Sequence, residues 1–224
     1  MAYFTKELFK FLKDLSKHNN REWFQKNKER YEEQVKEPVL DFIACIRPHL
    51  LKLCPQLKVD PSPHRGSMLR IYKDTRFSHD KTPYKTNAGV HFPYIPAQKG
   101  IHAPGFYLHL EPSMCFAAAG IWHPDPQTLT IIRNFIVNHP YAWEKVLKKK
   151  IVLEGDALVK APRGFDTNHR LIEDIKRKDF ITSLSFTQAE VCGASFLKDY
   201  IAACKKMLPL MEFLIEADSG RLMK

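Results

Sequence analysis

The stretch from Arg70 to Thr86, RIYKDTRFSHDKTPYKT, places five lysine and arginine side chains beside only two carboxylates, Asp74 and Asp80. An arginine offers phosphate or carboxylate oxygens a planar fork of donors, and a lysine offers a mobile positive charge. Several of these cations could therefore converge on one anionic group. The residues of this stretch that we predict to bind such a ligand are Arg70, Arg76, Lys81 and Lys85.

The same charges also have a purely structural interpretation. Asp74 and Asp80 could pair with Arg70 and Arg76, so that the stretch ties itself to a neighbouring sheet. If the stretch carries out chemistry instead, the two aspartates are its only nearby candidate bases, and Tyr84 is a candidate hydroxyl donor. A binding protein, an enzyme and an ion-paired strut all stay open at this point.

A second basic turn occurs in the segment APRGFDTNHR. Gly164 permits an unusual backbone conformation, and Arg163 beside it could present its guanidinium group to a ligand. Arg163 is therefore predicted as a further ligand-binding residue, provided that its turn lies beside the loop 73–85. The alternative is a plain turn whose arginine reaches the C-terminus of a helix.

Positive charge is concentrated in the middle of the chain. The formal net charge is +10, and residues 61–150 carry 12 Lys and Arg against 5 Asp and Glu. Such a face attracts phosphates, nucleic acid or acidic partners. Nucleic acid is the less favoured partner, because acids interrupt the basic excess and we expect Phe77 and Tyr84 to be half-buried. A non-catalytic module that binds nucleic acid or protein is the alternative function.

Several classes of site are not indicated. His91, His109 and His123 lack the spacing of a zinc motif such as H-E-x-x-H, so no metal is predicted. The chain has no Walker loop, no G-x-S-x-G and no dinucleotide-binding glycine motif, so no cofactor is predicted. Five scattered cysteines without a C-x-x-C pair favour a reducing cytoplasm. No apolar run approaches the length of a membrane span, and the oligomeric state stays open.

The spacing of apolar residues predicts an α+β fold in a single domain that spans residues 1–224. Helical spacing dominates residues 1–55, and alternation dominates residues 65–122. Both kinds of spacing occur in residues 123–224, which we expect to be mixed.

Three segments predict an antiparallel sheet over about residues 67–121. They read SMLRIY, NAGVHF and GFYLHLEPSMCFAAAGIW, with a turn near Glu111-Pro112-Ser113 in the last. Residues 151–160 and 180–186 could extend this sheet.

Local signals predict where several helices begin and end. Asn19 with Glu22, and Thr187 with Glu190, match the spacing of a capping box. The second box predicts a long helix directly after it. Pro48 is expected to kink or stop its helix about one turn earlier.

Four motifs together resemble one uncharacterised bacterial family, DUF2461, a domain of unknown function. They are NNREWFQKNKERYEE, RIYKDTRFSHDKTPYKT, GFYLHLEP with AAAGIWHPD, and LVKAPRGFDTNHRLIEDIKRKDF. The chain departs from the family at Lys73, where the family often has Arg, and at Ala119-Gly120, where it usually has two glycines. The resemblance implies a compact α+β domain and no established activity. We therefore rest the functional prediction on the residues: a cytosolic protein that binds a small phosphate- or carboxylate-bearing ligand through residues 70–86.

Overall fold

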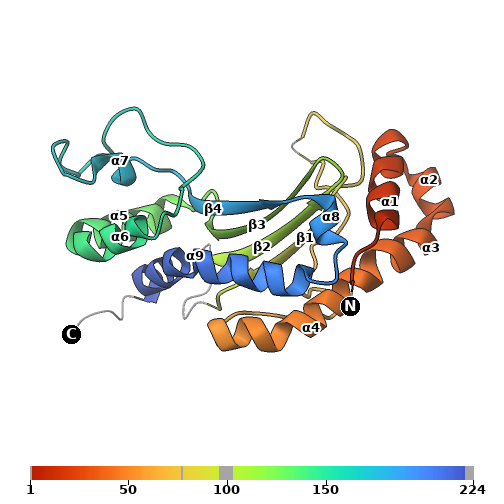
Figure 1. Ribbon diagram of the computed structural model, residues 1–224. Helices are drawn as coiled ribbons and strands as arrows, with labels where there is room; N and C mark the ends of the chain where they lie inside the picture. Colours follow the sequence, from red (N-terminus) through yellow and green to blue (C-terminus); the bar gives the residue numbers. More distant parts are fainter. Residues whose placement is uncertain (1, 77, 96–102, 220–224) are drawn as a thin grey trace. The chain divides into compact units, whose positions relative to one another are not determined.

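The computed structural model of the chain contains both helices and strands, as the helical and alternating spacing of apolar residues predicts (Figure 1). The structure describes residues 2–76, 78–95 and 103–219, so the prediction for Phe77 lies outside the described residues. The strands are β1 (Ala88–Pro93), β2 (Gly105–Glu111), β3 (Met114–Ile121) and β4 (Phe180–Phe186). The helices are α1 (Lys6–Lys17), α2 (Arg21–Lys26), α3 (Lys28–Tyr31), the π-helix η1 (Glu32–Lys36), α4 (Glu37–Leu53), α5 (Pro126–Asn138), α6 (Pro140–Lys148), α7 (Ile172–Ile175), α8 (Gln188–Val191) and α9 (Phe196–Ser219).

The four strands form one antiparallel sheet in the order β1-β2-β3-β4, which confirms the predicted α+β class. Pro112 and Ser113 connect β2 to β3, so the predicted hairpin turn is also confirmed. The predicted extension at 180–186 is present as β4, beside β3. Alternate residues of β3 are buried, as expected for a strand that covers a core with one face.

The strand expected at the start of the sheet, residues 67–72, is not formed. The segment makes only two isolated antiparallel bridges, Met68 with Val90 and Tyr72 with Tyr84. The two bridging positions are four residues apart on one side and six apart on the other, so the pairing slips by two residues. Extra residues on one side of a pair interrupt the ladder, which explains why this segment is irregular.

Residues 151–160 also differ from the prediction of a further strand. Glu154 forms a single bridge with Ile181, and Ala157 forms one with Arg177. The segment therefore touches the chain before and within β4 at two separate points, without a continuous ladder.

Two of the predicted helix ends are wrong. Pro48 lies inside α4, which continues to Leu53. Proline removes one backbone hydrogen bond, but Ile46 and Leu50 on either side of it are fully buried, and this packing holds the helix together. The capping box at Thr187 and Glu190 is confirmed, but it begins only the short α8, and α9 starts separately after it.

The contacts divide the chain into two compact units, each of which we describe by itself. The first contains Met1–Phe92, Tyr107–Ala117 and Leu184–Ala202, and the second contains Pro93–Phe106, Ala118–Ser183 and Ala203–Lys224. The single domain over residues 1–224 therefore stays a prediction. Among the described residues, no helix combines the length and apolar character needed to cross a membrane.

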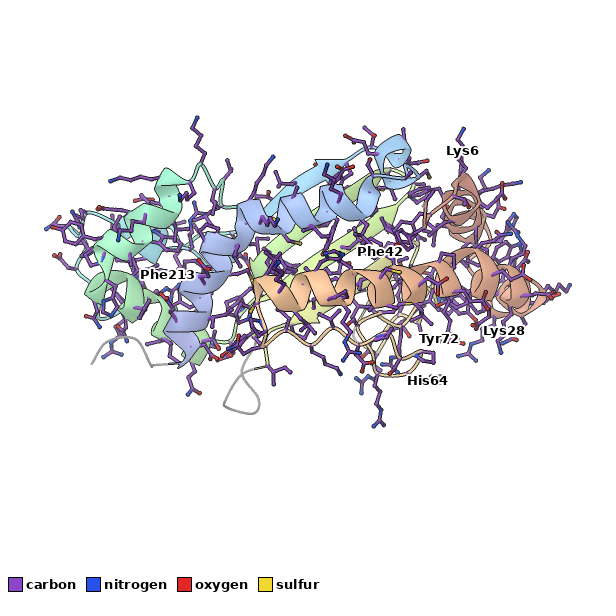
Figure 2. All side chains as sticks on the ribbon, turned by 60° about the horizontal axis from the view of Figure 1, so that its bottom comes forward. Lys6, Lys28, Phe42, His64, Tyr72 and Phe213 are labelled. Atoms are coloured by element: carbon purple, nitrogen blue, oxygen red, sulfur yellow. The ribbon has the colours of Figure 1, made fainter. Side chains whose placement is uncertain are left out.

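Aromatic side chains make the core of the first unit. Phe42 of α4 packs against Phe196 and Tyr200, at the start of α9, with ring centroids 5.7 Å apart in both pairs. Phe92 of β1 contacts Tyr200 from the sheet, and Figure 2 shows Phe42 between α4 and α9. Figure 1 shows α1, α2 and α3 beside one end of α4, where they carry the residues described below.

The second unit has its own apolar core around Trp143 of α6. This ring is fully buried and contacts Phe180 of β4 and Phe213 of α9. The other buried members come from α5, α6, α7 and α9, from the residue before α7 and from the end of β3: Ile121, Ile132, Ile136, Val146, Leu171, Ile175, Leu210, Leu214 and Ala217.

Candidate functional site

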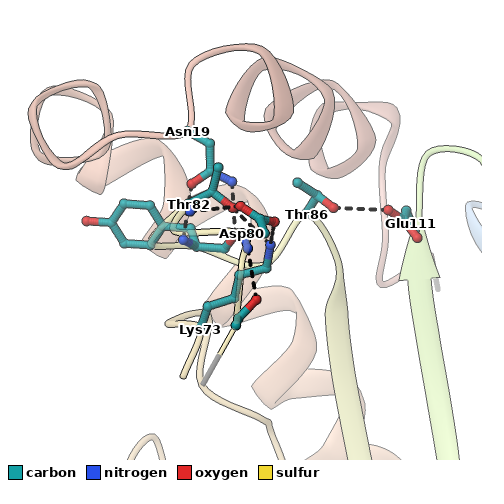
Figure 3. Close-up of polar contacts among 8 residues, drawn as sticks. Asn19, Lys73, Asp80, Thr82, Thr86 and Glu111 are labelled. Carbon is teal, nitrogen blue, oxygen red and sulfur yellow. Dashed lines mark hydrogen bonds and ion pairs between the residues drawn. The ribbon is translucent and has the colours of Figure 1, made fainter. Parts of the chain in front are cut away.

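The start of α2 forms one wall of the candidate site. Asn20 caps this helix, because its Oδ1 accepts the Trp23 N–H at 2.9 Å. The capping box predicted at Asn19 and Glu22 is therefore wrong by one residue. Asn19 instead contacts Tyr84, 65 positions later in the chain: its Nδ2 donates to the Tyr84 carbonyl at 2.9 Å, and its Oδ1 accepts the Tyr84 N–H at 3.1 Å (Figure 3).

Lys73 holds the opposite wall together. Its Nζ donates to Asp80 Oδ2 at 2.5 Å and to Thr82 Oγ1 at 2.9 Å (Figure 3). The Lys73 ammonium, and after it the hydrogen bonds from Thr82, hold the pKa of the Asp80 carboxyl well below its usual range. An ammonium group has three donors, so Lys73 can still offer one to another acceptor.

Asp74 and Arg76 pair with each other on the outside of the loop. Arg76 Nη2 lies 2.7 Å from Asp74 Oδ2, and the two side chains are 77% and 61% exposed. The hydrogen bonds from Arg76 lower the pKa of Asp74 to about 2. Asp74 therefore pairs with Arg76 rather than in the partly buried pair expected with Arg70, and Asp80 pairs with Lys73. So exposed a pair contributes little to stability.

Two tyrosines provide an aromatic surface between these walls. Tyr84 is only 2% exposed and stacks on Phe24, with centroids 4.1 Å apart and the ring planes 18° apart. Tyr72 lies 5.3 Å from Tyr84 and is 54% exposed. Burial raises the pKa of Tyr84, nearby Tyr72 raises it further, and the positive charge of Arg21 opposes the shift. Tyr84 is therefore a neutral hydroxyl at neutral pH.

These walls enclose a cleft with a volume of about 760 Å³, which we call the basic cleft. Three of its lining side chains are cationic, and among the described lining residues none is a carboxylate. A cleft of this size matches sites that hold small molecules. The lining residues are Asn19, Asn20, Arg21, Gln25, Tyr72, Lys73, Thr75, Lys81, Thr82, Pro83 and Tyr84.

The structure places the predicted ligand-binding residues unequally. Lys81 lines the basic cleft and donates from Nζ to the Thr75 carbonyl at 2.9 Å. Arg70, Arg76 and Lys85 belong to the same unit but are not lining residues. Arg70 is exposed, and Lys85 is half-buried. Burial, and then the charge of Arg70, lower the pKa of Lys85.

The other predicted site residues also differ in their placement. Arg163 is exposed in the second unit, next to Gly164, whose φ of 87° confirms the unusual backbone conformation. Its proximity to the loop 73–85 stays a prediction. Of the candidate catalytic residues, Tyr84 lines the basic cleft, whereas Asp74 and Asp80 do not.

The candidate site contains residues that the sequence analysis did not assign to it. Arg21, Asn19 and Tyr72 contribute to the lining, and Lys73 was noted only as a cation and a family difference. The one available signal was the presence of NNREWF and RIYKDTRF in the same family pattern. That pattern does not indicate that these two segments, which are far apart in the chain, contact each other in the fold.

Two of the histidines considered as metal ligands, His109 and His123, have other partners. His109 lies on β2 between Tyr107 and Glu111, with its Nδ1 3.2 Å from the Tyr107 hydroxyl and its Nε2 3.2 Å from Glu111 Oε2. Thr86 Oγ1 donates to the other carboxylate oxygen of Glu111 at 3.0 Å (Figure 3). His123 Nδ1 lies 3.1 Å from Asp179. In the part of the chain that the structure describes, no group of three or more His, Cys, Asp or Glu side chains could hold a metal ion.

A comparison with protein families gives the chain its assignment. The sequence matches the family DUF2461, described as a conserved hypothetical protein, over residues 7–213. The chain belongs to this family, which confirms the resemblance seen in the four motifs. No curated protein matches the chain.

Proposed function

We propose that the protein binds a small phosphate- or carboxylate-bearing molecule in the basic cleft. The observation that carries this proposal is the concave lining itself, in which Arg21, Lys73 and Lys81 occur without a carboxylate among the described lining residues. Opposite charge and fixed donors favour an anion in such a site. A concave site also suits a small molecule better than a polymer.

The three cations have different parts in this proposal. Arg21 makes no hydrogen bond or ion pair with any described residue that would compete with a ligand. Its guanidinium can therefore bind two oxygens of one anion. Lys81 and Lys73 each have donors left after their contacts with the loop. Arg70, Arg76 and Lys85 would add positive field outside the cleft rather than direct contacts.

We propose a binding function rather than a catalytic one. We also propose that the protein is located in the cytoplasm. A carboxylate base would be expected in many hydrolytic or proton-transfer sites, and the described lining contains none. Tyr84, the hydroxyl donor predicted from the sequence, lies in the lining together with a second tyrosine, Tyr72. The cytoplasm is supported by scattered cysteines without a C-x-x-C pair.

The test is a titration with inorganic phosphate and sulfate, followed by thermal unfolding and by calorimetry. A ligand that binds only the folded state raises the unfolding temperature with concentration. We expect stabilisation of the wild type that Arg21→Ala and Lys81→Ala strongly reduce. Lys28→Ala removes the same charge from an exposed position of α3 outside the cleft and should change nothing. Arg76→Ala and Arg163→Ala test the wider site predicted from the sequence.

Two results would count against the proposal. One is the absence of any stabilisation up to ~10 mM anion, about ten times a millimolar Kd. The other is binding of single- or double-stranded oligonucleotides that is tight at ~50 mM salt and falls steeply by ~200 mM, without an effect of small anions. That second result would support the alternative module that binds nucleic acid.

A further inference from the structure

We propose that the ligand of the basic cleft carries a planar aromatic ring, as a mononucleotide does, and that this ring stacks on Tyr72. This inference rests on the proposed function, and it adds the chemical class of the ligand. The volume of about 760 Å³ is the first support, because an inorganic anion would fill only a small part of it. The remaining space can accommodate another part of the same molecule.

Tyr72 provides the surface for that part. Its ring is 54% exposed although its neighbours in the aromatic cluster, Phe24 and Tyr84, are each 2% exposed. Single exposed apolar residues are common on protein surfaces and need no explanation. Tyr72 differs because it lies in a concave lining next to three cations. A ring there can stack with an aromatic ligand whose anionic group reaches those cations.

The backbone of Tyr72 is held in place by its neighbours before any ligand binds. Its backbone bridges to Tyr84, and the flanking residues pair through Lys73 N–H to the Pro83 carbonyl at 2.9 Å and Lys85 N–H to the Ile71 carbonyl at 2.7 Å. The Tyr84 ring, stacked on Phe24, supports the Tyr72 ring from one side. A stacking surface that is already ordered loses little entropy when a ligand binds.

The lining also offers polar groups for the edge of a heteroaromatic ring. Gln25 is exposed and makes no side-chain hydrogen bond with a described residue, so its amide can donate and accept. The amide of Asn19 is occupied with the Tyr84 backbone, and the Oδ1 of Asn20 accepts the Trp23 N–H, which leaves the Asn20 Nδ2 able to donate. We therefore expect polar contacts to the ring edge from Gln25 and Asn20, and several to the anion.

The experiment compares the affinities of adenosine monophosphate, ribose phosphate and inorganic phosphate by calorimetry. Uridine monophosphate is included as a mononucleotide with a different base. Stacking of one base on an aromatic side chain should make the mononucleotides bind about 5- to 150-fold more tightly than ribose phosphate. Tyr72→Ala should remove this preference without weakening ribose phosphate, whereas Tyr72→Phe should keep it. Circular dichroism and thermal unfolding verify that both variants fold.

The outcomes separate this inference from the proposed function. Equal binding of mononucleotides and ribose phosphate, with Tyr72→Ala unchanged, overturns the stacking inference and leaves anion binding in place. No binding of any phosphate compound overturns both. Oligothymidylate that binds far more tightly than the mononucleotides, with a steep salt dependence, would assign Tyr72 to a single strand and overturn the small-molecule ligand.

Discussion

The side chain of Asn19 satisfies both backbone polar groups of Tyr84. Its amide nitrogen donates to the Tyr84 carbonyl at 2.9 Å, and its amide oxygen accepts the Tyr84 N–H at 3.1 Å. An asparagine side chain used in this way replaces the partner that a neighbouring strand would provide. The contact joins the start of α2 to the loop 73–85, and so holds the two walls of the basic cleft together.

Asn19→Ala should destabilise the protein by about 1–3 kcal/mol, because it leaves a backbone donor and acceptor of a buried residue without their partner. The free energy of unfolding, measured in urea, is the direct readout. Gln25→Ala, at an exposed position of the same cleft, should stay within about 0.5 kcal/mol of the wild type. Equal values for the two variants would show that the Asn19 contact has no energetic role.

This contact also shows what the sequence can and cannot reveal about the site. Adjacent asparagines both suit a helix cap, and the spacing to Glu22 pointed to Asn19. The structure uses Asn20 as the cap. The choice is decided by Tyr84, which comes from a distant part of the chain. Local patterns contain no information on such a partner.

The stabilisation that Asp80 provides should be lost in acid, when its carboxylate becomes protonated. Its pKa in the folded state lies below that of the unfolded chain, about 3.9, because Lys73 donates to its carboxylate. The stabilisation is therefore complete above the unfolded value and is lost as the pH falls through the folded value. The free energy of unfolding, measured in urea, should fall less for Asp80→Asn than for the wild type as the pH drops from about 5 to 2.

Asp74→Asn provides the matched comparison, since the pKa of Asp74 is about 2 and its partner Arg76 lies outside the cleft. Its stabilisation should also disappear as the pH falls from about 4 towards 2. Both effects should shrink in high salt, because these pairs are exposed. An identical acid profile for the wild type and both variants would show that neither pair contributes measurably to stability, contrary to this prediction.

The fold was more predictable than the site, and the reason is visible in particular elements. The hairpin of β2 and β3 follows from alternating apolar residues around Pro112 and Ser113, which are all local signals. The segment 67–72 alternates in the same way but is irregular, because its partner residues, 84–90, contain two extra positions. Register depends on both partners, and a single segment does not encode it.

Gly120→Ala should be strongly destabilising. Gly120 has a φ of 123°, and an added Cβ would lie far inside van der Waals contact with the Phe180 carbonyl on β4. Backbone strain and overpacking together should cost about 3–5 kcal/mol. Gly164→Ala is the control, since its φ of 87° gives similar strain, but no atom lies within 4 Å of an added Cβ. If Gly120→Ala lowers the free energy of unfolding no more than Gly164→Ala does, β4 must shift easily to make room for the added Cβ.

Small residues such as Ala117 to Gly120 of β3 indicate that something packs closely against the strand, either another part of the chain or a ligand. At Gly120 the neighbour is the backbone of the adjacent strand. A glycine in a strand indicates that something approaches closely, but it does not identify what. This is why Gly120 contributes to the sheet and carries no argument for a site.

Asp179 should be a main determinant of local order in the second unit. The carboxylate is 1% exposed and accepts the His123 N–H at 2.7 Å and the Asp156 N–H at 3.0 Å. Asp179→Ala leaves both donors unpaired and should cost about 2–5 kcal/mol, whereas Asp179→Asn keeps one acceptor and should cost less.

Hydrogen exchange distinguishes this role of Asp179 from a general loss of stability. In Asp179→Ala the amides of His123 and Asp156 should exchange faster than neighbouring amides of the same unit, because they lose their acceptor. Asp156→Ala removes an exposed carboxylate but keeps the backbone N–H, so its exchange and stability should resemble the wild type. Uniformly faster exchange throughout the unit would show instead that Asp179 supports global stability, without holding these two segments in particular.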